Sequence, residues 1–128
     1  MKASFLRFRY LILAGEIDLG LQLVGEAINN TGDNWLLPEV HRVRGELLLR
    51  SGRDSDVEEC FGRALKAARA QSARLLELRA AMSLARLWRD QGKPRQAREL
   101  LAPVYGWFTE GFDTLDLKDA KALLDALA

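Results

Sequence analysis

The sequence predicts an all-α protein in which three antiparallel helix pairs stack into a solenoid and a final helix closes the stack. Three observations support this. Apolar residues recur at steps of three and four along most of the chain, the spacing of one buried helix face. Glycine or proline stands at most of the expected helix ends. The pattern of helix, glycine and second helix recurs after 37 and after 40 residues, and such periods are typical of solenoids.

The clearest element is a helix that begins at Pro38 and ends just before Gly52. Proline suits the first turn of a helix, where its missing N–H would be unpaired in any case. Glycine suits the left-handed residue that follows the last turn. Gly45 lies in the middle and costs about 1 kcal/mol relative to alanine, so we expect another helix backbone to approach closely there. The apolar stripe of this helix consists of Val40, Val43, Leu47 and Leu48.

A second helix follows this one, and the pair is echoed on both sides. Its apolar positions are Val57, Cys60, Phe61, Ala64, Leu65 and Ala68. The group Gly52, Val57, Phe61 and Ala64 is matched 40 residues later by Gly92, Ala97, Leu101 and Val104, and 37 residues earlier by Gly15, Gly20, Val24 and Ala27.

The other elements follow from the same signals. Residues 2–14 and 17–29 form the first predicted pair. Residues 75–88 are apolar on two faces, so this helix is expected to lie between neighbours. The segment 71–73 is the weakest boundary, because it lacks glycine and proline and indicates only a tight turn or a kink. A single domain over residues 1–128 is thus divided into repeats at about 1–34, 35–73 and 74–111, with a capping helix at about 114–127 whose outer side is polar.

The middle repeat resembles the tetratricopeptide repeat (TPR) family. Gly45, Leu48, Val57, Phe61 and Ala64 stand at the offsets of the TPR pattern, while His41, Arg44 and Arg69 depart from it. The resemblance covers about residues 1–110. It implies a right-handed solenoid in which the first helix of each pair lines the concave side.

Three stretches resemble the C-terminal helical region of large bacterial regulators. In those proteins a nucleotide cyclase-like or DNA-binding domain is joined to a predicted ATPase and then to TPR-like repeats. The similar stretches are residues 35–48, 83–88 and 105–114. The resemblance implies that this chain is the tail of a signalling or transcriptional regulator. No cyclase or ATPase motif is carried over, because none is present in the sequence.

Composition narrows the classes of function. Nineteen basic and eighteen acidic residues give a net charge of +1, which argues against a nucleic-acid partner, since that needs a concentrated basic face. The single cysteine, Cys60, excludes an internal disulfide and fits the cytoplasm. No apolar run reaches 18 residues, so no membrane span is expected. Arg7 and Arg9 interrupt the apolar stretch that a signal peptide would need.

The sequence contains no catalytic constellation. His41 is the only histidine, and no group of cysteines and histidines has the spacing of metal ligands. Acidic pairs near residues 54–59 are explained by the helix dipole, which favours negative charge at a helix start. We therefore expect neither an enzyme nor a cofactor.

The TPR resemblance places seven residues on the concave side. Five arginines among them would bind the carboxylates of an extended acidic peptide through paired hydrogen bonds. The alternative is that these arginines are paired with acids of the chain itself, namely Glu39, Glu46, Glu77 and Asp90. The predicted groove residues are Arg9, Arg42, Glu46, Arg79, Met82, Arg86 and Arg89.

The first helix suggests a second surface. It has no preceding helix in this sequence, and an exposed apolar patch usually marks an interface. The residues of this predicted self-association face are Phe5, Leu6, Phe8 and Ile12. They would support a homodimer or docking to an upstream segment, unless the helix buries them all against its own partner.

Two functions from different classes follow. The first is a non-enzymatic protein–protein interaction or scaffold module. The second is a small-molecule-sensing domain coupled to an ATPase or a nucleotide cyclase. A closed apolar pocket around Trp88, Tyr105 and Trp107 would favour the sensing domain, whereas an open groove would favour peptide binding.

Overall fold

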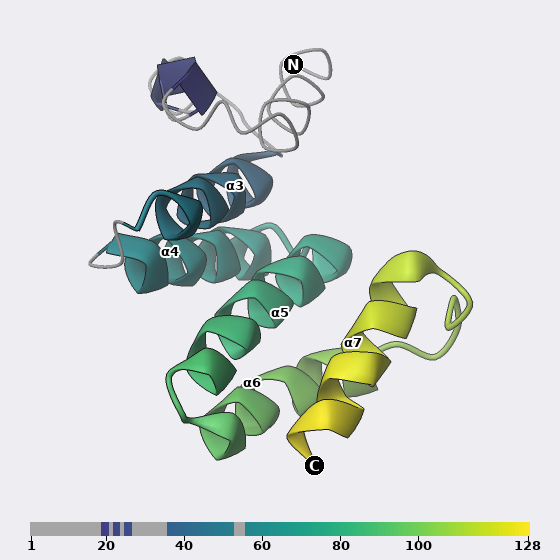
Figure 1. The fold of residues 1–128 in the computed structure, drawn as a ribbon. Coiled ribbons are helices and arrows are strands. Elements are labelled where there is room, and N and C mark those ends of the chain that lie inside the picture. The colour runs from purple at the N-terminus through teal and green to yellow at the C-terminus, as the bar shows by residue number, and fades with distance from the viewer. Residues whose placement is uncertain (1–18, 21, 24, 27–35, 53–55) are drawn as a thin grey trace.

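The computed structural model of the chain describes residues 19–20, 22–23, 25–26, 36–52 and 56–128. Most of the predicted first repeat lies outside these residues, as do Arg9 and the four residues of the predicted self-association face. The regular elements of the described part are all helical, which confirms the all-α prediction (Figure 1). From residue 36 onwards they are α3 (Leu37–Arg50), α4 (Val57–Ala70), α5 (Arg74–Asp90), α6 (Pro94–Gly106) and α7 (Leu115–Leu127).

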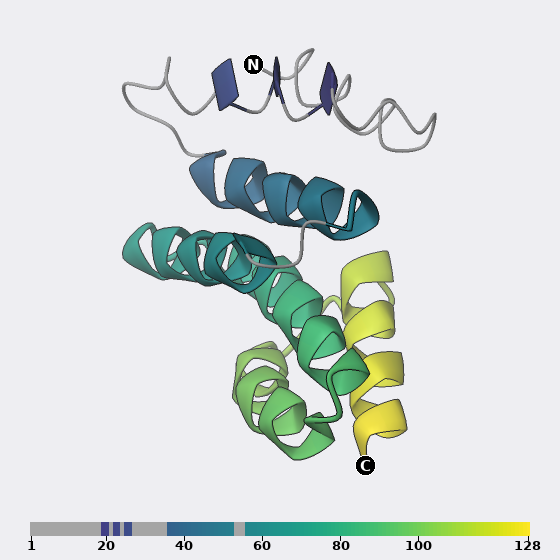
Figure 2. The same cartoon turned by 60° about the vertical axis from the view of Figure 1, so that its left-hand side comes forward.

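The helix α5 is the centre of this arrangement. It packs against α3, α4, α6 and α7, and each helix also packs against the next one along the chain. In the part of the chain described from α3 onwards, α4 and α6 do not pack directly on each other. Figures 1 and 2 show α5 crossing the molecule between the α3–α4 pair and the helices α6 and α7. The prediction that this helix lies between neighbours is therefore correct.

Two apolar clusters meet at α5. One joins α3, α4 and α5 around Phe61, which is fully buried, and the other joins α4, α5, α6 and α7 around Leu78 and Leu101. Trp88 and Leu100 pack against both clusters. The apolar side of α7 completes the second cluster with Leu117, Ala120, Leu123 and Leu127.

Gly45 has the close neighbour that its position predicted, but the neighbour is a side chain. A Cβ atom added at Gly45 would lie 2.5 Å from Cε1 and 2.8 Å from Cδ1 of Phe61. The Phe61 ring of α4 thus occupies the space over the glycine in α3. The expectation of backbone contact was wrong in this respect, because the tight packing of the two helices comes from an aromatic ring.

The turns show how the helices end without a common sequence signal. Gly52 and Gly92 follow α3 and α5 with φ of 78° and 79°. After α4 the same left-handed conformation is taken by Ser72, with φ of 54°. The N–H of Ala73 donates to the carbonyl of Ala68 at 2.9 Å and closes the end of α4. The weak boundary at residues 71–73 is therefore a full turn between two separate helices.

The two periods in the sequence have a structural cause. The helix α5 has 17 residues and α3 has 14, so the helices begin 37 residues apart but end 40 residues apart. Contacts near the helix starts keep the shorter period: Glu46 with Ser83, and Arg79 with Asp116, each pair separated by 37 residues. The glycines that end the helices keep the longer one.

None of the described helices is both long enough and apolar enough to cross a membrane.

Candidate functional site

A groove lies along α3, α5 and α7, with a volume of about 440 Å³. Five of the seven predicted groove residues line it, namely Arg42, Glu46, Arg79, Met82 and Arg86. Arg89 lies instead in an adjoining hollow, which also touches Arg86 and is lined by α5 and α7. We call the first hollow the α3–α5–α7 groove; its other lining residues are Glu39, Val43, Leu115, Asp116 and Asp119.

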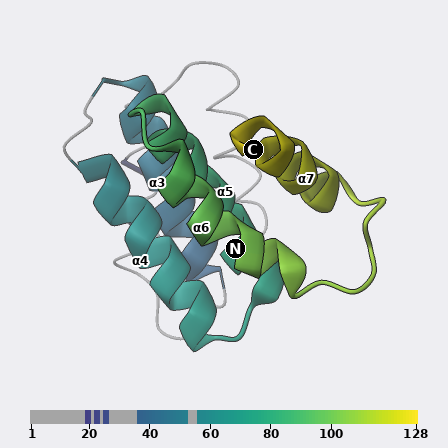
Figure 3. The ribbon, with the colours of Figure 1, turned by 90° about the horizontal axis from the view of Figure 1, so that it is seen from below.

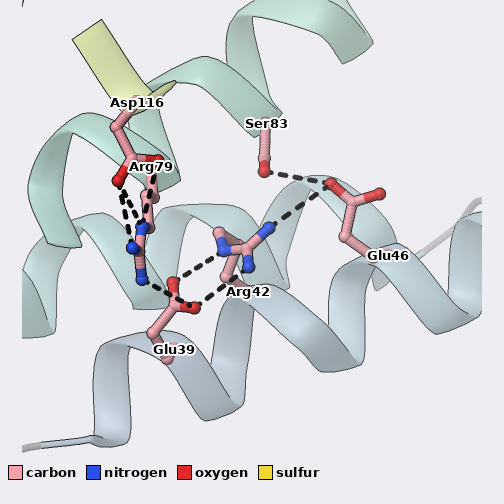
Figure 4. Close-up of polar contacts among 6 residues, drawn as sticks. All are labelled: Glu39, Arg42, Glu46, Arg79, Ser83 and Asp116. Carbon is pink, nitrogen blue, oxygen red and sulfur yellow. Dashed lines mark hydrogen bonds and ion pairs between the residues drawn. The ribbon is translucent and has the colours of Figure 1, made fainter. Parts of the chain in front are cut away.

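Glu39 is the buried centre of the groove. Its side chain is only 1% exposed. Arg42 donates to it twice, from Nε to Oε1 at 2.7 Å and from Nη2 to Oε2 at 3.0 Å (Figure 4). Nη1 of Arg79 lies 3.6 Å from Oε2. A buried carboxylate is costly unless it is paired in this way, so the two arginines hold a charge that the first turn of α3 places inside.

Arg79 connects this centre to the last helix. Its Nε lies 3.2 Å from both carboxylate oxygens of Asp116, and its Nη2 donates to Oδ2 at 3.0 Å. The sequence reading placed Asp116 on the exposed side of α7 and missed this role. A signal was present, since Arg42, Arg79 and Asp116 follow one another at steps of 37 residues.

The network extends to Glu46 and Ser83. The Ser83 hydroxyl donates to Oε1 of Glu46 at 3.0 Å, and Nη1 of Arg42 lies 4.0 Å from the same oxygen. Figure 4 shows the side chains from α3, α5 and α7 pointing toward one another. Three helices are therefore joined by one set of polar contacts at the groove.

The surroundings of Arg42 favour its charged form. Burial acts to lower the pKa of the guanidinium, but the hydrogen bond and charge of Glu39, with the charges of Glu46 and Asp116, outweigh it and raise the pKa above its usual value. Arg42 therefore stays charged and committed to its own chain at any ordinary pH.

This pairing corrects the simple form of the acidic-peptide hypothesis. Arg42 and Arg79 are paired with carboxylates of the chain, and Arg89 lies 3.1 Å from Asp90. Glu77, expected as another groove partner, is instead bound by Arg69 and Arg74. Within the described part of the chain, Arg86 alone of the predicted groove arginines has no hydrogen bond or ion pair.

Apolar side chains lie beside Arg86 in the groove. Met82 is one turn away on the same helix, Val43 faces from α3, and Leu115 lies on α7. Leu115 is 74% exposed, the most exposed large apolar residue of the described chain. The groove thus combines one unpaired guanidinium with an apolar surface that the fold leaves open.

The three aromatic residues that would mark a closed pocket are apart. Trp107 is 54% exposed and packs edge-on against Phe108, with ring centroids 5.2 Å apart. Tyr105 packs against Phe112, and the Trp88 indole donates to Glu58. No described hollow is lined by all three aromatic residues, so the feature that would favour a small-molecule sensor is not found there.

His41 and Cys60 have no catalytic surroundings. Burial raises the pKa of the Cys60 thiol above its usual value, and Nη1 of Arg44 donates to its sulfur at 3.3 Å. Burial, together with the charges of Arg63 and Arg44, lowers the pKa of His41. Among the residues that the structure describes, no three histidine, cysteine, aspartate or glutamate side chains gather as metal ligands.

Comparison of the chain with protein-family models, with curated proteins and with solved structures found no match.

Proposed function

We propose that the chain is a non-enzymatic protein-interaction module, built as a TPR-like solenoid, that binds a partner segment in the α3–α5–α7 groove. The observation that carries the proposal is the unpaired Arg86 beside an open apolar surface. An interaction site typically offers such a combination, because apolar contact supplies affinity and a placed charge supplies specificity.

The pairing of helices supports the solenoid. The first helices of successive pairs, α3, α5 and α7, pack in order along the chain, while α4 and α6 are separated from each other by the rest of the described fold. The contacts between first helices recur at 37 residues. A stack of repeats is held by nearest-neighbour contacts of this kind.

The paired arginines define the rigid part of the proposed site. Since Arg42 and Arg79 are held by Glu39 and Asp116, they shape the groove and leave ligand binding to Arg86. The expected ligand is a peptide with an apolar side chain for Met82 and Leu115 and one carboxylate for Arg86. The wording shared with large bacterial regulators is the basis for proposing that the module acts inside a signalling or transcriptional regulator in the cytoplasm.

The proposal is tested by selecting peptides from a random display library on the immobilised chain and measuring the affinity of the selected sequences. We expect an acidic residue beside an apolar one in the selected sequences. Arg86→Ala should weaken their binding about tenfold or more, since a hydrogen bond to a charged group contributes about 1.5–3 kcal/mol.

The matched control is Arg95→Ala, which removes the same charge from an exposed side chain on α6 whose printed partner is Glu99. This variant should bind the selected peptides as the unchanged chain does. Equal affinity of the Arg86→Ala variant, or selected peptides without any acid, would contradict the proposal.

A further inference from the structure

A second hollow lies away from the groove, where α4 ends, α5 begins and α6 passes. Its volume is about 330 Å³, and it shares no lining residue with the α3–α5–α7 groove. Figure 3 shows α4 and α7 on opposite sides of the α5–α6 pair, so the two hollows face different sides of α5. We call it the α4–α6 hollow; it is lined by Arg69, Arg74, Glu77, Glu99, Leu100, Pro103, Val104 and Trp107.

Positive charge exceeds negative charge in this hollow. The carboxylate of Glu77 is buried, and it accepts from Nε of Arg69 at 3.1 Å and from Nη1 of Arg74 at 3.3 Å. Two guanidiniums thus share one carboxylate. The other acid of the hollow, Glu99, is paired with Arg95 at 3.1 Å, outside the lining.

The two guanidiniums keep donors for a further ligand. The side chains of Arg69 and Arg74 are 53% and 45% exposed. A guanidinium carries five N–H donors, and each of these arginines gives one to Glu77. A second carboxylate at this place would find charge and donors already oriented by the first.

The opposite wall is apolar. Leu100, Pro103 and Val104 present one side of α6, and the Trp107 ring stands at the rim. The guanidinium carbon of Arg74 lies 4.9 Å from the ring centroid, so the cation and the ring hold each other in place. The indole N–H of Trp107 makes no hydrogen bond within the described part of the chain, which adds a free donor to the rim.

From this arrangement we propose that the α4–α6 hollow binds a peptide segment in which an apolar residue adjoins an acidic one. The apolar side chain would lie against Leu100, Pro103 and Trp107, and the carboxylate would bind the two arginines. The inference is independent of the proposed groove function, because the two sites have no residue in common.

The shape of the hollow favours a segment of a larger partner. Its volume is at the lower end of the range of about 300–1,000 Å³ for small-molecule pockets, and such pockets enclose about 70–90% of a ligand. Half-exposed side chains form much of the wall here, so a ligand would be covered on one side only. A protruding side chain of a partner chain needs no more than that.

The probe is acetyl-Leu-Glu-Leu-amide, compared with the neutral acetyl-Leu-Gln-Leu-amide. Binding is followed by ¹⁵N NMR of the indole N–H signals, one of which is assigned to Trp107 by its loss in Trp107→Phe. We expect a saturable shift of the Trp107 signal with the acidic peptide. The neutral peptide should bind about tenfold or more weakly, since a charge-assisted hydrogen bond is about twice as strong as a neutral one.

Arg74→Gln should weaken binding of the acidic peptide about tenfold or more, while the control Arg98→Gln removes a charge from an exposed position of α6 and should change nothing. Thermal unfolding of both variants shows that they are folded. Equal binding of the two peptides, or unchanged binding by the folded Arg74→Gln variant, would overturn the proposal. Binding of 4-methylpentanoate as tight as that of the peptide would assign the hollow to small organic acids and would overturn it as well.

Discussion

At Gly45 a single hydrogen atom decides whether α3 and α4 pack. The Cβ atom of an alanine would meet the Phe61 ring at 2.5 Å, and this ring is fully buried and has no free space to move into. Alanine favours a helix over glycine by about 1 kcal/mol, but overpacking costs typically about 1–3 kcal/mol. We therefore expect Gly45→Ala to lower the free energy of unfolding, measured by urea denaturation.

Gly62→Ala is the matched control for that change. Gly62 lies inside α4, is exposed, and an added Cβ atom would meet nothing within 4 Å. Only the helix propensity acts there, so this variant should be more stable by up to about 1 kcal/mol. A stabilising effect of both substitutions would mean that the Phe61 ring yields easily and that the packing argument is wrong.

His41 gives the chain a pH dependence with a definite sign. Its pKa is lowered in the folded state by burial and by the charges of Arg63 and Arg44. The unfolded state then binds the proton more readily, so stability is complete above about pH 6.5, the usual histidine pKa, and falls as the pH decreases through the window just below it.

The test compares the urea midpoint of the chain and of His41→Gln between pH 7 and pH 5.5. We expect the unchanged chain to lose stability over this interval and the variant to lose less. His41 is the only histidine in the sequence, and aspartate and glutamate titrate mostly below this interval, near pH 4. Parallel pH profiles would show that the folded state does not oppose protonation of His41.

At the scale of elements, the turn between α4 and α5 uses a residue that is poorly suited to it. Ser72 has φ of 54°, where Gly52 and Gly92 serve the corresponding turns. The left-handed conformation costs an ordinary L-residue roughly 1–2 kcal/mol, although glycine loses more chain entropy on folding. We expect Ser72→Gly to raise the free energy of unfolding by about 0.5–1 kcal/mol in urea denaturation, and a loss of stability would contradict this account.

The sequence predicts the helices well because their signals are local. Apolar spacing and the Gly and Pro stops indicate α3, α6 and α7 with ends close to the observed ones. The turn at Ser72 was not recognised as a full helix end, because a serine in the left-handed conformation has no local signature. The pairing of Arg79 with Asp116 was missed for another reason: it depends on how α5 and α7 pack, which residue type alone does not reveal.

The contact of Arg79 with Asp116 is predicted to hold α7 on α5. Both side chains are partly exposed, and solvent weakens such a pair, but three donor–acceptor contacts and the neighbouring Glu39 strengthen it. A double-mutant cycle with Arg79→Ala and Asp116→Ala should give a coupling free energy of about 1 kcal/mol. A coupling near zero would mean that the apolar side of α7 holds the helix in place unaided.

At the scale of the whole molecule, the two ends of the stack differ. Toward the C-terminus, α7 buries its apolar side against the core and exposes charged residues such as Lys118, Lys121 and Asp125. A polar outer side of this kind ends a solenoid without inviting another copy. The prediction of self-association through Phe5, Leu6, Phe8 and Ile12, which lie outside the described residues, therefore places any dimer contact at the other end.

Light scattering over a range of concentrations tests this last prediction. We expect the molar mass to rise above the 14.4 kDa of one chain toward twice that value as the concentration increases, and Phe8→Glu to keep it at one chain. Leu115→Glu is the control, since Leu115 is the most exposed large apolar residue described and lies on α7. Loss of the dimer in Leu115→Glu alone would move the interface to the α3–α5–α7 groove, and a constant mass of one chain would remove the dimer altogether.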